Sequence, residues 1–162
     1  MIKLIIYILI TFFLDNLFNN LEITKNLLFP HLVLSSLIII FIMLKDNKKY
    51  LILTLILGFI YDILYNNIPY NIFIFFIIGL VIISFYKLFK TNFINTILLT
   101  IIIIFIYNFL IFLISVIYLN NDYTTYIFIN KFINSILLNV IYNSLSYLIF
   151  CHNKSYYLSK KK

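Results

Sequence analysis

The sequence predicts an all-α membrane protein, a bundle of six transmembrane helices with both termini in the cytoplasm. Hydrophobic residues make up 64% of the 162 residues and charged residues only 10%, whereas a soluble domain holds about 25% charged residues. The mean hydropathy is +1.10. Six apolar segments are each close to the ~20 residues that span a bilayer. The lysines gather in every second connection between these segments.

The six spans are bounded by clusters of asparagine, proline and charged residues. These clusters lie at 19–26, 45–49, 66–69, 87–92 and 120–125. A proline cannot continue a preceding helix, because it lacks an N–H and clashes one turn back. We therefore expect a tight turn at Pro69, with one long kinked helix as the alternative. The predicted spans are 4–18, 28–44, 50–65, 70–86, 93–119 and 126–150.

The lysines predict the orientation, because positive charge accumulates on the cytoplasmic side of membrane proteins. With both termini cytoplasmic, ten lysines lie on that side and only Lys25 and Lys131 on the other. Residues 1–162 then form a single transmembrane domain that ends in a short basic cytoplasmic tail, 151–162. The net charge of +7 is therefore a topology signal and predicts no nucleic-acid binding. The basic loops are expected to attract anionic lipid of the bilayer.

Polar residues recur every four residues along five of the spans, so each set occupies one helix face. Lipid cannot satisfy such groups, and we expect these faces to point into the bundle or towards a partner helix. The sets are Tyr7, Thr11 and Asp15; His31 and Ser35; Thr54, Gly58 and Asp62; Asn71, Phe75 and Gly79; and Lys131, Ser135, Asn139, Asn143 and Ser146.

Asp62 is the strongest candidate functional residue. An acid inside a span costs about 2.5–3.5 kcal/mol on insertion scales, so we favour a buried, partnered Asp62 that organises the bundle. Ion or substrate handling and an interfacial position are the alternatives. Asp15 lies close to a span end, and we expect it at the membrane interface. His31 follows Pro30 and is expected to begin a helix. Asn139 is expected to hydrogen-bond between helices, and Gly58 to permit close packing.

The motifs of several enzyme classes are missing from the sequence. It has two histidines, two glycines and one cysteine, and it contains neither a zinc H-E-x-x-H motif nor a glycine-rich phosphate loop. Asp15 and Asp62 could in principle form a protease dyad. They lack the Asn-x-Gly and Asn-x-x-Asp signatures of lipoprotein signal peptidases and the Gly-x-Gly-Asp of presenilin-like proteases. We therefore expect no enzymatic activity, metal or cofactor.

One stretch resembles the centre of MreD, the rod shape-determining membrane protein family. It reads Leu57-Gly58-Phe59-Ile60-Tyr61-Asp62, then Asn67-Ile68-Pro69-Tyr70-Asn71, then Gly79-Leu80. Phe29-Pro30-His31-Leu32-Val33-Leu34 resembles the start of the family's preceding span, and Phe132-Ile133-Asn134-Ser135-Ile136-Leu137-Leu138-Asn139 resembles its last span. Many members of the family have glycine where Tyr70 stands and proline where Asn134 stands. The sharp matches are Gly58, Asp62, Pro30 and Asn139.

The resemblance implies a non-enzymatic scaffold of the bacterial cell-elongation complex in the cytoplasmic membrane. Such proteins act with the bitopic protein MreC, with the MreB cytoskeleton, with the glycosyltransferase RodA and with a penicillin-binding transpeptidase. The implied fold is similar to the substrate-binding subunits of energy-coupling-factor transporters. We expect Gly58 and Asp62 to order the turn between the third and fourth spans. The alternative is a substrate-binding subunit of such a vitamin transporter, although the chain lacks that family's Ala-x-x-x-Ala docking patch and its longer loops.

Overall fold

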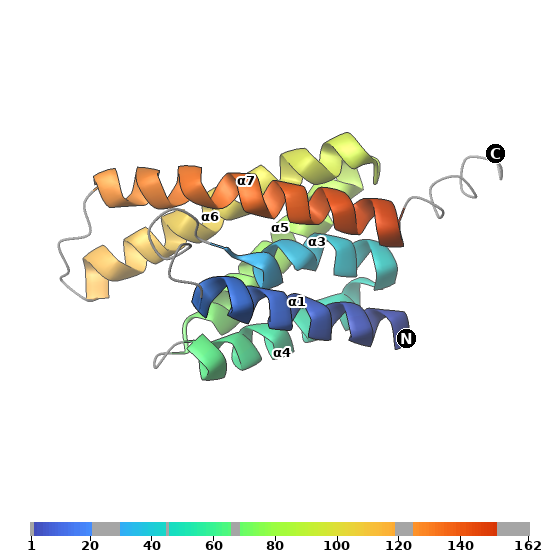
Figure 1. The fold of residues 1–162 in the computed structure, drawn as a ribbon, viewed down its shortest axis with the longest axis horizontal. Coiled ribbons are helices and arrows are strands. Elements are labelled where there is room, and N and C mark those ends of the chain that lie inside the picture. Colours follow the sequence, from blue (N-terminus) through green and yellow to red (C-terminus); the bar gives the residue numbers. More distant parts are fainter. Residues whose placement is uncertain (1, 21–29, 45, 66–68, 119–124, 152–162) are drawn as a thin grey trace.

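A computed structural model describes residues 2–20, 30–44, 46–65, 69–118 and 125–151, and within these ranges helices are the regular structure (Figure 1). Successive helices alternate in direction, so that α1 begins and α7 ends at the same end of the bundle. We call the opposite end, where α1 and α4 end and α3 and α5 begin, the distal end. The helices are α1 (Ile2–Asn20), α3 (Leu32–Leu44), α4 (Asn47–Tyr65), α5 (Asn71–Leu88), α6 (Phe93–Tyr118) and α7 (Thr125–Phe150).

The helices agree with the predicted spans, apart from shifts at their ends. Helices α1 and α4 each have 19 residues and extend beyond the predicted 4–18 and 50–65. Helix α3 begins at Leu32, later than the predicted 28–44. Parts of four predicted breaks lie outside the described residues, namely 21–26, 45, 66–68 and 120–124, as do residues 27–29 and 119 and the tail from 152 onwards.

Four of the described helices are long and apolar enough to cross a membrane: α1, α5, α6 and α7. The chain is thus a helical membrane protein with several candidate spans. Helix α4 has the same length as α1 but carries Lys48, Lys49 and Asp62. Helix α3 has only 13 residues, which at ~1.5 Å per residue cover about 20 Å.

Helix α3 is the centre of the bundle. Ten of its 13 residues are buried, and it packs against α1, α4, α5, α6 and α7. A helix that is hydrophobic on every side is stable only when it is buried on every side. The continuous apolar run from Leu37 to Met43 satisfies that condition, because neighbouring helices surround it. The other five helices therefore acquire their positions by packing against α3 or against each other.

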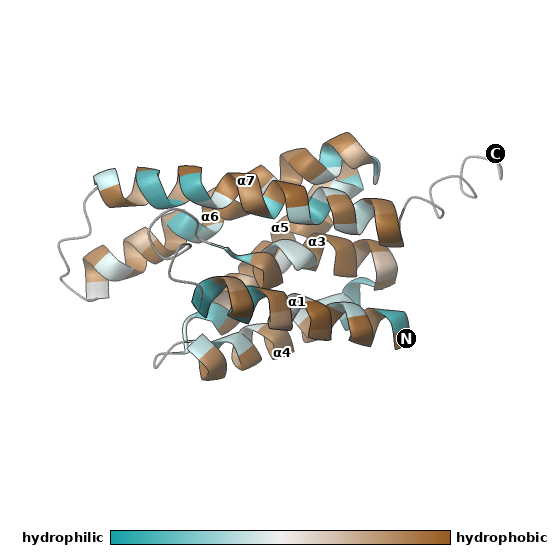
Figure 2. Cartoon of the chain, viewed as in Figure 1, coloured by the Kyte–Doolittle hydropathy of each residue, from teal (hydrophilic) through white to brown (hydrophobic). Residues whose placement is uncertain are grey.

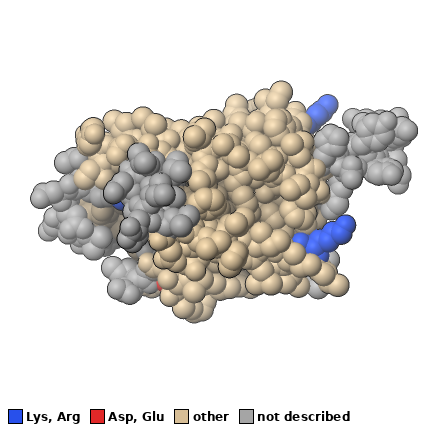
Figure 3. Space-filling model, in the orientation of Figure 1, with Lys and Arg blue, Asp and Glu red and all other residues tan. Residues whose placement is uncertain are grey.

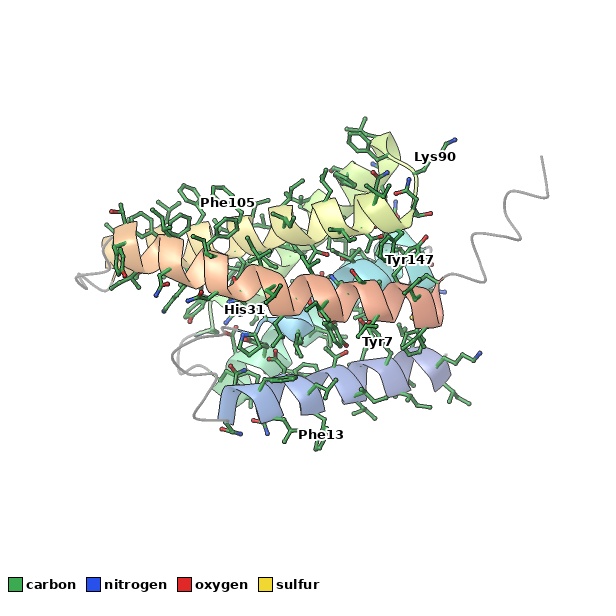
Figure 4. The ribbon with its side chains drawn as sticks, turned by 45° about the horizontal axis from the view of Figure 1, so that its top comes forward. Tyr7, Phe13, His31, Lys90, Phe105 and Tyr147 are labelled. Carbon is green, nitrogen blue, oxygen red and sulfur yellow. The ribbon has the colours of Figure 1, made fainter. Side chains whose placement is uncertain are left out.

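The outer surface of the bundle is apolar between its two ends. Large hydrophobic side chains such as Phe13 and Leu137, at 64% and 63% exposure, project from it, and Figure 4 shows Phe13 pointing away from the bundle. Figure 2 shows brown, hydrophobic residues along the outer helices. On the face drawn in Figure 3, the large basic patches lie at the end that holds the start of α1. This distribution suits a belt of lipid.

The connection before α4 carries an exposed helix cap. The Asp46 carboxyl accepts hydrogen bonds from the backbone amides of Lys48, at 3.1 Å, and Lys49, at 3.2 Å. The Lys49 amide, and secondarily the charge of the Lys49 side chain, hold the pKa of Asp46 below its usual range. Asp46 thus satisfies two of the four amides that every helix leaves unpaired at its start.

Candidate functional site

Asp62 joins α4 to the beginning of α5. One of its carboxyl oxygens accepts hydrogen bonds from the backbone amide of Asn71, at 3.2 Å, and from the Asn71 side chain, at 2.8 Å. The other oxygen accepts from the backbone amide of Ile72, at 3.1 Å. Asp62 is only 4% exposed and Asn71 is fully buried. In an apolar environment the first amides of a helix have no water to bond. Asp62 supplies the missing acceptors.

Gly58 allows α5 to approach α4 closely enough for these bonds. A Cβ atom at Gly58 would lie 2.8 Å from the Asn71 carbonyl oxygen and 2.8 Å from the Ile72 Cα. Both of those atoms belong to the backbone and cannot turn away. Further along the hairpin, a Cβ at Gly79 would meet only side-chain atoms, 3.1 Å from Thr54 Cγ2. Going back along α4 from Gly58 to Thr54, the contacts move forward along α5 from Ile72 to Gly79. The two helices therefore form an antiparallel hairpin, which excludes one long kinked helix.

Asp15 occupies the equivalent position in the first hairpin. It is fully buried, and one carboxyl oxygen accepts a hydrogen bond of 2.7 Å from the backbone amide of Leu32, the first residue of α3. Asp15 therefore faces into the bundle, as its polar stripe predicts, and its depth at the membrane interface stays a prediction. Proximity to a helix end in the sequence does not imply exposure, because the start of α3 folds back over Asp15 and removes it from the surface.

The two hairpins share one construction. In each, an aspartate near the end of the first helix accepts a hydrogen bond from the first residue of the second helix. In each, a proline lies two residues before that helix: Pro30 before α3 and Pro69 before α5. Pro30 is buried and Pro69 is exposed. The distal end of the bundle is consequently organised by two buried carboxyl groups.

His31 connects the first hairpin to α6 and α7. Its backbone amide donates a 3.3 Å hydrogen bond to Asn139 Oδ1, and Asn139 donates to the Ser135 carbonyl at 2.7 Å. The His31 ring packs against Tyr107 of α6, with ring centroids 4.7 Å apart. The predicted roles of His31 at a helix start and of Asn139 as an interhelical hydrogen-bonding residue therefore agree with these contacts. Figure 4 shows His31 close to α7.

Three buried polar atoms at the distal end have no hydrogen-bond partner among the described residues. They are His31 Nδ1, Tyr65 Oη and the Asn71 side-chain oxygen. An unpaired buried polar atom costs about 1–3 kcal/mol, and such groups in proteins usually bond ordered water or a ligand. These three buried atoms are polar groups of the distal end that the described residues leave without a hydrogen bond.

Asn143 ties three helices together deeper in the bundle. It is fully buried, and its side-chain nitrogen donates to the Ser35 carbonyl of α3, at 2.9 Å, and to Thr100 Oγ1 of α6, at 2.8 Å. On the other side of the bundle, Thr11 and Tyr142 share a hydrogen bond that joins α1 to α7. Polar side chains therefore hold α7 to three neighbouring helices.

The link between Asn143 and Thr100 gives a measurable coupling. We expect the variants Asn143→Leu and Thr100→Val, which preserve volume, to show a coupling energy of about 1 kcal/mol in a double-mutant cycle, since interhelical hydrogen bonds in membranes reach about 1–2 kcal/mol. Unfolding in a mixed detergent series, followed by circular dichroism, measures it. Ser115→Ala is the control, because among the described residues buried Ser115 donates its hydrogen bond within α6, to the Phe112 carbonyl. Additivity of Asn143→Leu with Thr100→Val would contradict the link.

Sequence reasoning missed the polar face of α6. Thr96, Thr100 and Asn108 are buried there, and they lie four and eight residues apart on one face. The rule that found the other five stripes would have found this one as well. No sequence signal identifies Tyr107 as the neighbour of His31, because a tyrosine in an apolar span has many positions that suit it.

The described residues contain no group of three or more His, Cys, Asp or Glu side chains placed to hold a metal ion. Comparison of the chain with protein-family models, with curated proteins and with solved structures gives no match. The arrangement of the buried polar groups is therefore the observation from which function is inferred.

Proposed function

We propose that the chain is a non-enzymatic membrane scaffold of the bacterial cell-elongation complex, acting with an MreC-like bitopic protein, MreB, a RodA-type glycosyltransferase and a penicillin-binding transpeptidase. The observation that carries the proposal is the capped α4–α5 hairpin. Asp62 accepts three hydrogen bonds from the start of α5, so its carboxyl group serves to fix the hairpin. A rigid hairpin is suited to recognition of another membrane protein.

The resemblance to MreD supports the same proposal. Its four sharp matches are Pro30, Gly58, Asp62 and Asn139, and each lies at the described distal end. Gly58 and Asp62 position α5 against α4. Asn139 accepts a hydrogen bond from the backbone amide of His31, the residue after Pro30. The matching residues thus lie at two helix contacts, α4 with α5 and α7 with the start of α3.

The proposal includes six spans, both termini in the cytoplasm and the bacterial cytoplasmic membrane. Ten of the 12 lysines then lie on the cytoplasmic side, as positively charged loops do. The proposal keeps α3 as the second of these spans, although its 13 residues are shorter than the ~30 Å core. On this topology the distal end, with its two capped hairpins, faces the outer leaflet.

Co-purification tests the proposal. The tagged full chain, extracted from its host membrane in mild detergent and analysed by mass spectrometry, is expected to retain an MreC-like protein. Gly58→Leu, which forces α5 away from α4, is expected to lower its recovery at least fivefold. Gly79→Ala is the matched control, because its new methyl group meets only side chains. Unchanged recovery with both Gly58→Leu and Asp62→Asn would contradict the role of the hairpin.

One observation favours a second candidate, a substrate-binding subunit of an energy-coupling-factor type transporter. The three unpaired polar atoms of His31, Tyr65 and Asn71 could bond a small polar substrate at the distal end. Recovery of two ABC-type ATPases and a coupling membrane subunit, together with a bound vitamin, would favour this candidate over the scaffold.

A further inference from the structure

Two asparagine side chains lie on the outer surface of α7. Asn130 is exposed and Asn134 is half-buried, while the polar residues Ser135, Asn139 and Asn143 occupy the opposite, buried face of the helix. The Asn134 side-chain nitrogen donates a 3.0 Å hydrogen bond to the Asn130 side-chain oxygen. That bond leaves the Asn130 amide hydrogens and the Asn134 oxygen without a partner among the described residues.

The length of α7 places Asn134 inside the hydrocarbon core. A helix of 26 residues is about 39 Å long, and Asn134 lies about 14 Å from its first residue. If such a helix crosses a hydrocarbon core of about 30 Å, at most about 9 Å of its length extends beyond the core at its first residue. Asn134 therefore lies about 4 Å or more inside the core for any placement in which α7 spans it. Lipid chains offer no hydrogen bond there.

The asparagines continue into a stripe of exposed apolar residues. Steps of three or four residues keep side chains on one face of a helix. The stripe consists of Asn130, Asn134, Leu137, Ile141, Leu145 and Leu148, and its four apolar members are 63%, 52%, 55% and 49% exposed. Asn134, Ile141 and Leu148 recur every seven residues, as do Asn130 and Leu137, which is the spacing of two helices packed along a left-handed seam, and an asparagine in such a seam fixes the register.

We propose that this stripe is the contact between two copies of the chain in the membrane, with Asn134 hydrogen-bonded to Asn134 of the second copy. A twofold axis normal to the membrane brings the same residue of each copy to the same depth. An asparagine amide contains both donor and acceptor, so two such amides satisfy each other. A second copy thus supplies, at the required depth, the partner that lipid lacks. This contact does not depend on which complex the chain serves.

Energy transfer between fluorophores tests the proposal. Full chains that carry donor or acceptor fluorescent proteins at the N-terminus are reconstituted in lipid vesicles over a series of protein-to-lipid ratios. For the unaltered chain we expect more energy transfer than random mixing of the chains gives. For Asn134→Leu we expect at least about tenfold weaker association, because an interhelical hydrogen bond of this kind changes the association constant by about a factor of ten. The control is Asn16→Leu with Asn20→Leu, which removes an equivalent 3.0 Å asparagine pair near the end of α1.

Disulfide cross-linking is a second experiment, in which Asn130 and Asn134 are both retained. In a Cys151→Ser background, Leu137→Cys is expected to form a disulfide-linked dimer under mild oxidation. Ile129→Cys is expected to form much less, because Ile129 is 51% exposed on a face turned by about 80° from Leu137 and by about 140° from Asn134. Association that is random in the unaltered chain, or that persists unchanged in Asn134→Leu, would overturn the proposal. Equal cross-linking at the two positions would do the same.

Discussion

Replacing Gly58 by alanine is expected to lower the free energy of unfolding by about 2 kcal/mol or more. The alanine gains about 1 kcal/mol of helix propensity, so the steric cost has to exceed that gain. The new Cβ would lie 2.8 Å from two backbone atoms of α5, and overpacking of this kind costs about 1–3 kcal/mol, occasionally more. Relief requires α5 to move, which also stretches the hydrogen bonds from Asn71 and Ile72 to Asp62. We therefore expect the steric cost to fall at the upper end of the range.

Denaturation of the purified chain in a mixed detergent series, followed by far-ultraviolet circular dichroism, measures this difference. Gly79→Ala is the matched control on the same hairpin. Its nearest neighbours are Thr54 Cγ2 and Oγ1, at 3.1 and 3.2 Å, and Leu51 Cδ2, at 3.4 Å. These side chains need to move by only a few tenths of an ångström, so we expect a change within about 1 kcal/mol of zero. Equal effects at the two glycines would show that the backbone contact at Gly58 is unimportant.

The sequence predicts helix faces well because lipid penalises polar groups wherever they occur. Tyr7, Thr11 and Asp15 were predicted to face inward, and they are the three buried residues of α1. The same reasoning placed Ser135, Asn139 and Asn143 on the inner face of α7, where they are buried. Helix ends follow from Pro, Asn and Lys clusters for the same reason. These features depend on one helix and its solvent.

The partners of these residues could not be predicted, since they depend on how helices are placed relative to each other. A four-residue spacing puts Asp15 on a face but does not reveal that the Leu32 amide lies 2.7 Å from it. It likewise does not pair His31 with Tyr107 of α6, 4.7 Å apart between ring centroids. The central position of α3 was also hidden. From its sequence, α3 is predicted to be an ordinary short span. The packing of five other helices around it explains why it is apolar on every side.

Replacing Asp62 by alanine is expected to destabilise the chain by about 3 kcal/mol or more, because each buried polar group left without its hydrogen-bond partner costs about 1–3 kcal/mol. Three donors at the start of α5 would lose their acceptors, and Asn71, which supplies two of them, is fully buried. Asp62→Asn is expected to cost less, about 2 kcal/mol, because one oxygen still accepts from Asn71 while the new amide opposes the Ile72 N–H.

The matched control for Asp62→Asn is Asp46→Asn, which makes the same chemical change at the exposed cap of α4. Asparagine and aspartate are about equally good at such positions, so Asp46→Asn is expected to be nearly neutral in the same detergent denaturation series. The comparison separates the effect of the acid-to-amide change itself from the effect of losing a buried acceptor. If Asp62→Asn were as mild as Asp46→Asn, the three hydrogen bonds to α5 would not be what holds the hairpin together. The hairpin would then depend on the packing at Gly58 alone, and Gly58→Ala would become the more damaging change.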